Sequence, residues 1–509
     1  MKENIVNKGV GIKNQKYIGI IDIGTTTIKF ILFNLLGEVV SEYFSVVKQK
    51  YPQYGWVEED PTEIWNTTEN VIANAINDST YISKIAAIGI CNQRESTMIW
   101  DCESGKPLSN LIVWQDRRTS DRCLEIKKSG LEDSIKQKTG LVVDPYFSST
   151  KLEWVLQNSS FLKNELISGR IKFGTIDSWI VYKLTGNHLT DVSNASRTML
   201  FNISSLLWDE DLLKIFNIPT QILPEVLPSF GSAIFGYTKK NSVFKKEIPI
   251  CAILGDQQAA LFGQRCFKKG DIKSTYGTGA FLMVNTGEEK IFSKNNLLTT
   301  IFYESNNKKI NYALEASIYN AGSVFQWLKE GLKLIKEYKE IELKAADICY
   351  NDKLFFVPAF TGLGAPFWDP YARGMIIGLT RDTDGRQIIR ASLEALAYRT
   401  RDVVEAMEKD ANLSIEEIKI DGGVSRNPVF CKILADLTGI KIKAFEFGEF
   451  TALGTMYAAA IGYGLFNSIE DIIDSNISKE YIPNIKKDLR EKLYKRWCKA
   501  LSKTLHWDE

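Results

Sequence analysis

Twice along the chain, a short polar turn rich in glycine and threonine joins two apolar segments. The first turn lies between Tyr17–Asp22 and Ile28–Phe33, and the second, Tyr276-Gly277-Thr278-Gly279, lies between Asp271–Ser274 and Ala280–Val284. Apolar runs of this length on either side of a glycine turn predict β-hairpins. Alternating strand-like and helical segments continue to about residue 265, which is typical of an α/β protein. The recurrence of the hairpin predicts two related halves.

The first turn, Asp22-Ile23-Gly24-Thr25-Thr26-Thr27, carries groups suited to a phosphate. Glycine lets the backbone approach a ligand closely, and consecutive N–H groups and hydroxyls can donate to phosphate oxygens. An aspartate just before the turn could hold a magnesium ion, directly or through water. Taken alone, the segment is also compatible with a plain β-hairpin that has threonine at its strand ends.

Two more polar turns follow segments that are predicted to be buried strands. Gly255-Asp256-Gln257-Gln258 comes after Ile250–Leu254, and Asp421-Gly422-Gly423 comes after Ile418–Ile420, with Asn427 just before an expected helix. Ligands of α/β proteins collect at the C-terminal ends of strands. Each turn alone could be a strand end followed by a helix cap, but several such turns together favour a nucleotide site.

Two other nucleotide-binding folds are poor fits. The chain has no GxxxxGK[ST] motif, because its Gly105-Lys106 pair is followed by proline, and no strand–GxGxxG–helix pattern occurs. The repeated hairpins and the late glycine turn favour the actin-like fold instead. In that fold, two ribonuclease H-like α/β domains, as in hexokinase, Hsp70 and actin, surround a central cleft.

Charge and composition exclude several classes of protein. Lysine and arginine number 63 against 62 aspartates and glutamates, so a nucleic-acid-binding basic face is not expected. No apolar run approaches the roughly 18–20 residues of a membrane helix. The two histidines, His188 and His506, are too few for a His-based triad or a multi-histidine zinc site. The eight scattered cysteines form no CxxC pair, which predicts free thiols in a reducing, cytoplasmic compartment.

A further set of residues suits a small polar molecule. Arg94 and Glu95 offer a hydrogen-bond donor and an acceptor side by side at a strand end, Trp114 could pack on a carbon skeleton, and Tyr146 follows an Asp-Pro turn. The alternative is a surface Arg–Glu pair and a core tryptophan.

Three helices are also predicted. Asp60-Pro61 predicts a capped helix that runs to about Ala75, and the spacing of leucine and alanine predicts another over Gln387–Lys409. The Lys-rich tail from Glu480 predicts a helix with a solvated face.

In order along the chain, these segments resemble the glycerol kinases of the FGGY carbohydrate-kinase family. The resemblance runs from about Tyr17 to Gly464 and is most specific at Asn194–Asn202 and Pro358–Pro366. The other similar segments are Asp22–Thr27, Tyr51–Glu58, Asn92–Glu95, Val113–Arg117, Asp144–Phe147, Phe173–Asp177 and Gly255–Gln258.

The resemblance implies an enzyme that transfers a phosphoryl group from ATP to glycerol, with Mg²⁺, to give sn-glycerol 3-phosphate. It implies a polyol-binding domain over residues 17–264, a nucleotide-binding domain over 265–464 and a helical extension over 465–509. Asp256 matches the family's general base, and Asp22 matches the acid associated with magnesium. The residues implied for the polyol are Arg94, Glu95, Trp114, Tyr146, Asp256, Gln257 and Phe281, and those implied for the nucleotide are Thr25, Thr26, Thr27, Lys29, Thr278, Gly322, Gln326, Gly423 and Asn427.

The resemblance also implies a cytoplasmic homo-oligomer, either a dimer or a tetramer. At two positions the chain departs from glycerol kinases, which usually have glutamine at Ile23 and often arginine at Lys29; lysine keeps the positive charge but loses the bidentate geometry. Two alternatives stay open: a kinase for another small polyol or ketose, such as erythritol or dihydroxyacetone, and a catalytically silent scaffold. The bulky Trp114 and Phe281 favour a three-carbon acceptor, and the intact Asp256 argues against a scaffold.

Overall fold

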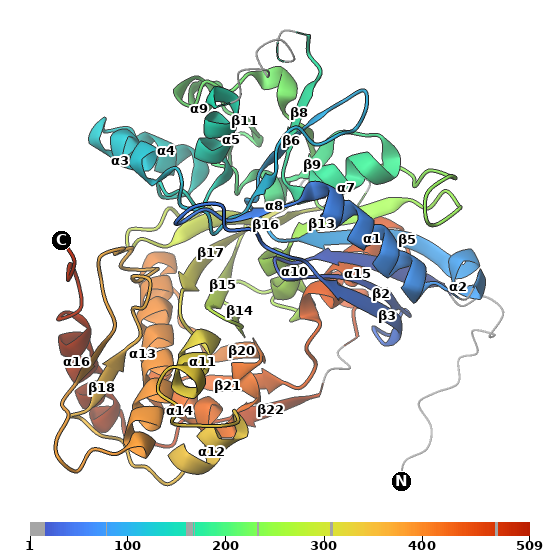
Figure 1. Ribbon diagram of the computed structural model, residues 1–509. Helices are drawn as coiled ribbons and strands as arrows, with labels where there is room; N and C mark the ends of the chain where they lie inside the picture. The colour runs from blue at the N-terminus through green and yellow to red at the C-terminus, as the bar shows by residue number, and fades with distance from the viewer. Residues whose placement is uncertain are drawn as a thin grey trace, which may run out of the picture. The chain divides into compact units, whose positions relative to one another are not determined.

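The computed structural model describes residues 16–77, 79–158, 166, 168–231, 234–305, 309–473 and 477–509. The chain divides into two compact units (Figure 1). Unit 1 contains the chain up to Gly263 together with Ile301–Ile310 and Phe450–Ser475. Unit 2 contains Gln264–Thr300, Asn311–Glu449 and Asn476–Glu509.

Unit 1 is built on a five-stranded sheet with the strand order β13-β5-β1-β2-β3. Strands β1, β2 and β3 are antiparallel neighbours, whereas β5 and β13 run parallel to β1. The predicted first hairpin is therefore confirmed as β1–β2. The strands are β1 (Tyr17–Ile23), β2 (Thr27–Phe33), β3 (Val39–Val46), β5 (Ile85–Asn92) and β13 (Ile250–Gly255).

Helices and short strands surround this sheet. The predicted helix α1 spans Pro61–Ala75, because Asp60 caps it by accepting hydrogen bonds from the N–H groups of Thr62 and Glu63. The other helices are α2 (Ser79–Lys84), α3 (Ser120–Lys128), α4 (Glu132–Thr139), α5 (Ser148–Gln157), α7 (Ile176–Thr185), α8 (Val192–Ala195), α9 (Glu210–Ile215), α10 (Asp256–Gly263) and α15 (Phe450–Gly462). The short strands are β4 (Glu58–Glu59), β6 (Met98–Asp101), β7 (Leu111–Ile112), β8 (Ile171–Gly174), β9 (Leu189–Asp191), β10 (Phe201–Asn202), β11 (Leu207–Trp208) and β12 (Glu225–Leu227).

The second sheet has seven strands in the order β16-β17-β15-β14-β20-β21-β22 and belongs to unit 2, except that Ile301–Glu304 of β16 and Ile310 of β17 are assigned to unit 1. Its central strands repeat the pattern of unit 1: three antiparallel strands (β17, β15, β14) are followed by two that run parallel to β14 (β20, β21). This shared order confirms the two related halves. The seven strands are β14 (Ile272–Tyr276), β15 (Ala280–Gly287), β16 (Leu298–Glu304), β17 (Ile310–Ile318), β20 (Glu417–Gly422), β21 (Lys441–Phe445) and β22 (Ser478–Tyr481). Two further strands, β18 (Phe355–Val357) and β19 (Met375–Ile377), pair with each other in a separate sheet.

The longest helix of unit 2 is α13 (Gly385–Ala411), which extends the predicted helix at both ends. It begins at a capping box between Asp384 and Gln387, and it ends where Asn412 adopts a left-handed conformation with φ 48°. The other helices are α11 (Gly322–Glu330), α12 (Lys339–Ala345), α14 (Pro428–Thr438) and α16 (Lys487–Leu501).

The C-terminal tail forms the predicted helix with a solvated, lysine-bearing face, but it does more than the prediction says. It first forms β22, and one face of α16 is buried in the core of unit 2. Trp497 is fully buried, stacks on Tyr398 with ring centroids 5.1 Å apart, and donates its indole N–H to Asp402. Because the large Trp497 side chain is buried in the core of unit 2, the tail is part of that unit.

The compact units also differ from the predicted consecutive segments 17–264, 265–464 and 465–509, because α15 returns to unit 1. Helix α15 crosses α10 at very short range: a Cβ on Gly454 would lie 2.0 Å from the carbonyl oxygen of Ala259. Only glycine permits this approach. A contact between segments so far apart in sequence leaves no signal in local composition.

Within the described residues, no helix combines the length and apolar character that a membrane crossing needs. All eight cysteines are free, as predicted, and Cys349 and Cys498 are the exposed ones.

Candidate active site

The first Gly/Thr hairpin, in unit 1, is held by backbone hydrogen bonds and by side chains. The N–H of Gly24 donates to the carbonyl of Thr27 across the turn at 2.9 Å. The hydroxyl of Thr25 accepts a hydrogen bond from the indole N–H of Trp114 at 3.0 Å and lies 3.4 Å from the amide oxygen of Gln93, to which it donates. Thr26 is exposed at the tip of the turn.

The strand register brings two predicted residues together below this turn. Asp22 on β1 lies opposite Lys29 on β2, and on its other side it lies opposite Cys91 of β5. Cross-strand partners have neighbouring side chains on one face of a sheet. The predicted acid and the predicted phosphate-binding cation therefore share a face.

Arg94 lies just beyond the end of β5 and is 98% buried. Its Nη1 donates to the side-chain oxygen of Gln258 at 3.0 Å, and its Nε lies 3.3 Å from Oδ1 of Asp256. Asp256 is the first residue of α10, directly after β13, and its side chain is 29% exposed. Two strand ends of the same sheet thus place a guanidinium beside the predicted base, whose side chain is partly exposed.

Glu95 is buried and has a left-handed backbone with φ 63°. Its carboxylate accepts a 2.6 Å hydrogen bond from Nε of Arg197, and its carbonyl accepts from the hydroxyls of Thr97 and Ser148. A non-glycine residue with such a φ is strained and persists where its surroundings fix it. These bonds fix the direction of the Glu95 side chain.

Tyr146 and Trp114 form the aromatic part of the cluster. Their ring centroids are 5.5 Å apart in an edge-on arrangement, and the guanidinium of Arg197 lies 5.5 Å from the Tyr146 ring. The Nζ of the fully buried Lys151 donates to the Tyr146 carbonyl at 2.6 Å. Burial lowers the pKa of Lys151 to about 8.

Several buried polar residues that support this cluster escaped prediction. The side-chain amides of Asn92 and Asn194 donate to each other, at 3.0 and 3.2 Å. Asp191 accepts hydrogen bonds from the hydroxyl of Ser229 and from the N–H groups that open α8, and burial raises the pKa of Asp191. The segment Asn194–Asn202 was singled out in the sequence, yet the role of Arg197 as partner of Glu95 depends on a contact across 102 positions.

Glu59 is a second unpredicted residue, and it is fully buried. It accepts a hydrogen bond from the side-chain N–H of Gln93 at 2.9 Å, and Gln93 in turn contacts Thr25. Burial raises the pKa of Glu59 to about 7, and the nearby Glu63 adds to the shift. A chain of hydrogen bonds therefore joins Glu59, through Gln93 and Thr25, to Trp114.

In unit 2, the second hairpin is held by its backbone. The N–H of Gly322 donates to the carbonyl of Gly277 at 2.9 Å, and the N–H groups of Ala321 and Ser323 donate to the carbonyl of Thr278. Thr278 is exposed at the tip of the turn. A Cβ on Gly322 would lie 2.6 Å from the Gly277 carbonyl oxygen, so helix α11 must begin with glycine to support the turn.

The remaining predicted residues also belong to unit 2. Gln326 is exposed on α11 and donates to Glu330 at 3.0 Å. Gly423 is exposed with open space around its Cα. The side-chain oxygen of Asn427 caps α14, because it accepts from the N–H groups of Val429 and Phe430. Phe281 lies on β15 opposite Thr275 and Ser317.

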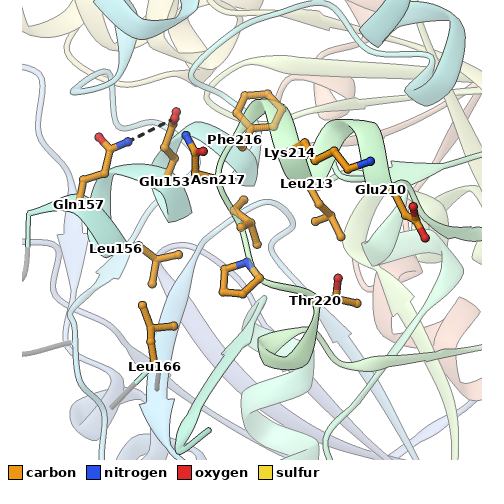
Figure 2. A pocket seen from close by; sticks show the side chains of 12 residues that line it. Glu153, Leu156, Gln157, Leu166, Glu210, Leu213, Lys214, Phe216, Asn217 and Thr220 are labelled. Atoms are coloured by element: carbon orange, nitrogen blue, oxygen red, sulfur yellow. Dashed lines mark hydrogen bonds between the residues drawn. The ribbon is translucent and has the colours of Figure 1, made fainter. Parts of the chain in front are cut away.

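A cavity of about 930 Å³ lies elsewhere in unit 1, between α5 and α9 (Figure 2). Leu156, Leu213 and Phe216 make much of its wall apolar. The carboxylate of Glu153 at its rim is already paired with Arg122, at 2.8 Å. The cavity contains none of the predicted site residues.

The described residues contain no group of three or more histidine, cysteine, aspartate or glutamate side chains placed to hold a metal ion. This does not conflict with a magnesium site at Asp22, since Mg²⁺ in kinases is usually held by one or two carboxylates together with substrate phosphates. The half-buried Asp22, at a strand end beside a turn of N–H groups and hydroxyls, fits that pattern.

Comparison with known proteins decides the family. Residues 17–263 match the N-terminal domain of the FGGY family of carbohydrate kinases, and residues 272–463 match its C-terminal domain. The chain belongs to this family.

Similar FGGY proteins include several glycerol kinases. The glycerol kinase of Petrotoga mobilis is 48% identical over 97% of this chain and 99% of its own length, and glycerol kinase 2 of Thermotoga maritima is 47% identical over 97% and 100%. The crystal structure of Plasmodium falciparum glycerol kinase with ADP has a TM-score of 0.91 at 35% identity, and covers 96% of this chain and 98% of that one. A xylulose kinase from Lactobacillus acidophilus, at 24% identity and a TM-score of 0.84, shares the fold.

Proposed function

We propose that this FGGY kinase transfers the γ-phosphoryl group of ATP to glycerol and forms sn-glycerol 3-phosphate. Its similarity to glycerol kinases extends over nearly the full length of both chains. The structural observation that carries the proposal is the Asp256 carboxylate, which lies 3.3 Å from Nε of the buried Arg94 and whose side chain is 29% exposed at the end of β13.

Glycerol would bind in unit 1 through its hydroxyl groups. Arg94 would donate hydrogen bonds to a hydroxyl oxygen, and Glu95, fixed by Arg197, would accept from a hydroxyl. Trp114 and Tyr146 would cover the carbon skeleton, and Gln257 would be a further contact in unit 1. Phe281 belongs to β15 of unit 2, and its proposed contact with glycerol rests on the resemblance to glycerol kinases alone. Aromatic walls with a few placed polar groups are typical of small-molecule sites.

Asp256 would act as the general base, and most of the remaining catalysis would be positioning. As the acceptor oxygen attacks the γ-phosphorus, its proton passes to the Asp256 carboxylate and the bond to the ADP oxygen breaks. Phosphoryl transfer requires the protein to do little covalent chemistry, and a well-placed carboxylate is sufficient as the base. A site without histidine is therefore adequate.

The phosphates of ATP would bind at the two Gly/Thr hairpins. Thr25, Thr26, Thr27 and Lys29 would supply N–H groups, hydroxyls and a positive charge on the first hairpin, and Thr278 would supply an N–H group and a hydroxyl on the second. Gly322, Gln326, Gly423 and Asn427 would lie along the rest of the nucleotide. Asp22 would hold Mg²⁺, which, when bound, neutralises charge on the phosphates.

The first experiment measures ADP release by the purified enzyme with Mg-ATP and one acceptor at a time: glycerol, dihydroxyacetone, erythritol, xylulose or none. Strong preference for glycerol is the expected result. Preference for a longer acceptor would keep the base but contradict the assignment of the aromatic walls. ADP release that no acceptor stimulates would contradict the kinase activity and favour a silent scaffold.

A further inference from the structure

Strand β3 forms the outer edge of the sheet in unit 1 and is unusually apolar for an edge. Among the described residues, β2 is its one strand partner, and β3 is the last strand in the sheet order. Five of its residues are exposed, four of them apolar or aromatic: Val39 (38%), Tyr43 (41%), Phe44 (61%) and Val46 (65%), with Glu42 as the charged one. Proteins that keep an edge strand solvated usually shorten it or load it with charge, so this edge is suited to pairing with another chain.

The hydrogen bonds of β3 show which of its backbone groups face outward. The N–H of Val47 donates to the carbonyl of Thr26, and Thr27 lies opposite Val46. In an antiparallel ladder, bonded and non-bonded positions alternate. Tyr43 and Ser45 therefore bond to β2, while Glu42, Phe44 and Val46 direct their N–H and C=O groups away from it.

The sequence of the strand is symmetric about its centre. Around Tyr43 it reads Val-Val-Ser before Glu42 and Ser-Val-Val after Phe44, so the pattern V-V-S-x-Y-x-S-V-V is the same in both directions. The segment ends in opposite charges, with Glu38 before it and Lys48 after it. When two such strands run antiparallel about Tyr43, the valines, the serines and Tyr43 each meet their own kind, Glu42 meets Phe44, and each end meets the opposite charge.

We propose that β3 pairs antiparallel with β3 of a second copy of this chain, about a two-fold axis at Tyr43. In this register Glu42 and Phe44 of opposite copies form hydrogen-bonded pairs, which uses the outward-facing groups. Tyr43 lies across from its own counterpart in a non-hydrogen-bonded pair. The two five-stranded sheets then continue into each other, and the interface is isologous, as two-fold dimers require.

The ladder between β2 and β3 is irregular only at one end of β3, so the segment centred on Tyr43 is intact. The register of β3 on β2 shifts between Leu32 and Phe33, next to Val40, whereas Ser41–Val46 pair regularly. The proposed contacts centre on this regular segment. They involve no residue of the proposed active site, so the dimer and the kinase activity can fail independently.

Disulfide trapping tests the register directly. In a Cys349→Ser, Cys498→Ser background, which removes the exposed thiols, we expect Tyr43→Cys to form a covalent dimer on mild oxidation. Cα atoms of a non-hydrogen-bonded pair are about 4.5 Å apart, within the range of a disulfide. Phe44→Cys is the matched control: its own counterpart is a diagonal neighbour, and we expect little crosslinking. Equal crosslinking of both variants, or of neither, would overturn the proposed register.

Light scattering tests the interface without oxidation. We expect wild-type protein to have at least twice the mass of one chain, and Phe44→Pro to halve that mass. Proline removes an N–H that faces away from β2, so the internal ladder stays complete. Phe44→Ala keeps the N–H and should weaken the dimer less, and circular dichroism checks that both variants are folded. A monomeric wild-type protein, or a folded Phe44→Pro variant of unchanged mass, would overturn the proposal.

Discussion

The two Gly/Thr hairpins have similar sequences but are supported in different ways. In unit 1 side chains reinforce the backbone hydrogen bonds of the turn, since the hydroxyl of Thr25 lies between the indole of Trp114 and the amide of Gln93. In unit 2 the turn is tied by main chain, since the carbonyls of Gly277 and Thr278 accept N–H groups from the start of α11. The first hairpin depends on the side chains of the neighbouring residues. The second depends on glycines that let the turn and the start of α11 approach each other closely.

The same contrast extends to the surroundings of each hairpin. The cluster in unit 1 consists of buried charged and amide side chains that fix one another, including Arg94, Glu95 and Arg197. Around the second hairpin, Thr278 and Gly423 are exposed, and Asn427 is engaged as a helix cap. Substitutions in unit 1 should therefore act through lost charge and hydrogen bonds, and those in unit 2 mainly through steric fit.

The largest effect is expected at Asp256. Asp256→Asn preserves size and the oxygen that accepts from the N–H of Gln257, but it removes the proton acceptor. We expect kcat to fall about 10²- to 10⁴-fold, while ATP binding measured by calorimetry is retained. Asp22→Asn is the matched carboxylate change, and raised Mg²⁺ should restore part of its activity but none of that of Asp256→Asn. Near-normal turnover by Asp256→Asn would exclude Asp256 as the base.

Arg94→Ala should chiefly weaken the binding of glycerol. Arg94 is buried between Gln258 and Asp256, and truncating one partner of such a pair costs about 2–5 kcal/mol. We expect the KM for glycerol to rise roughly 30-fold or more, with the KM for ATP nearly unchanged. Arg94→Lys keeps the positive charge but loses the forked guanidinium, so its KM for glycerol should lie between those of the wild type and Arg94→Ala. An unchanged KM for glycerol in Arg94→Ala would contradict the assignment.

The buried Glu59 should make the stability of unit 1 depend on pH. Its pKa is raised from 4.5 to about 7 in the folded chain, so the folded state binds more protons between these values. Its contribution, about 3 kcal/mol, is then present below pH 4.5 and is lost as pH rises through 7. We measure the free energy of unfolding in urea at pH 5 and at pH 8. We expect it to fall less between these two pH values in Glu59→Gln than in the wild type. A similar change for the exposed Glu225→Gln would show that the effect is not specific to Glu59.

The sequence predicted the parts of the molecule that depend on local pattern. Strand–turn–strand units, the Asp60 cap of α1 and the long helix α13 all follow from periodicity and capping. What it missed depends on long-range contacts, such as the packing of α15 on α10 at Gly454 and the burial of Trp497. In the candidate site, the resemblance to FGGY kinases named Glu95, whereas the partner that fixes it, Arg197, emerged from the fold.

Two glycines of unit 2 give a matched steric test. Gly322→Ala would place a Cβ 2.6 Å from the Gly277 carbonyl oxygen, and relief of such overpacking typically costs about 1–3 kcal/mol. We expect it to lower the thermal stability and to raise the KM for ATP roughly 10-fold. Gly423→Ala meets open space at φ −63° and should leave stability unchanged. If the KM for ATP nevertheless rises in Gly423→Ala, that result would support a nucleotide next to Gly423; equal loss of stability in both would contradict the steric argument.

The smallest effect is expected at Asn427, where capping and nucleotide binding can be separated. Its side-chain oxygen is already used by the N–H groups of Val429 and Phe430, so a contact with the nucleotide has to be donated by its amide nitrogen. Asn427→Ala loses both the capping oxygen and the amide nitrogen, and it should lower the free energy of unfolding by about 1 kcal/mol. Asn427→Ser keeps a capping oxygen without the amide, so its stability should match the wild type. A neutral hydrogen bond is worth about 0.5–1.5 kcal/mol, and we therefore expect the KM for ATP to rise about 2- to 10-fold in the serine variant. If the serine variant has unchanged stability and an unchanged KM for ATP, the side chain of Asn427 serves only as the helix cap. Unit 2 would then bind the nucleotide near Asn427 through its main chain, which is also how it holds its hairpin.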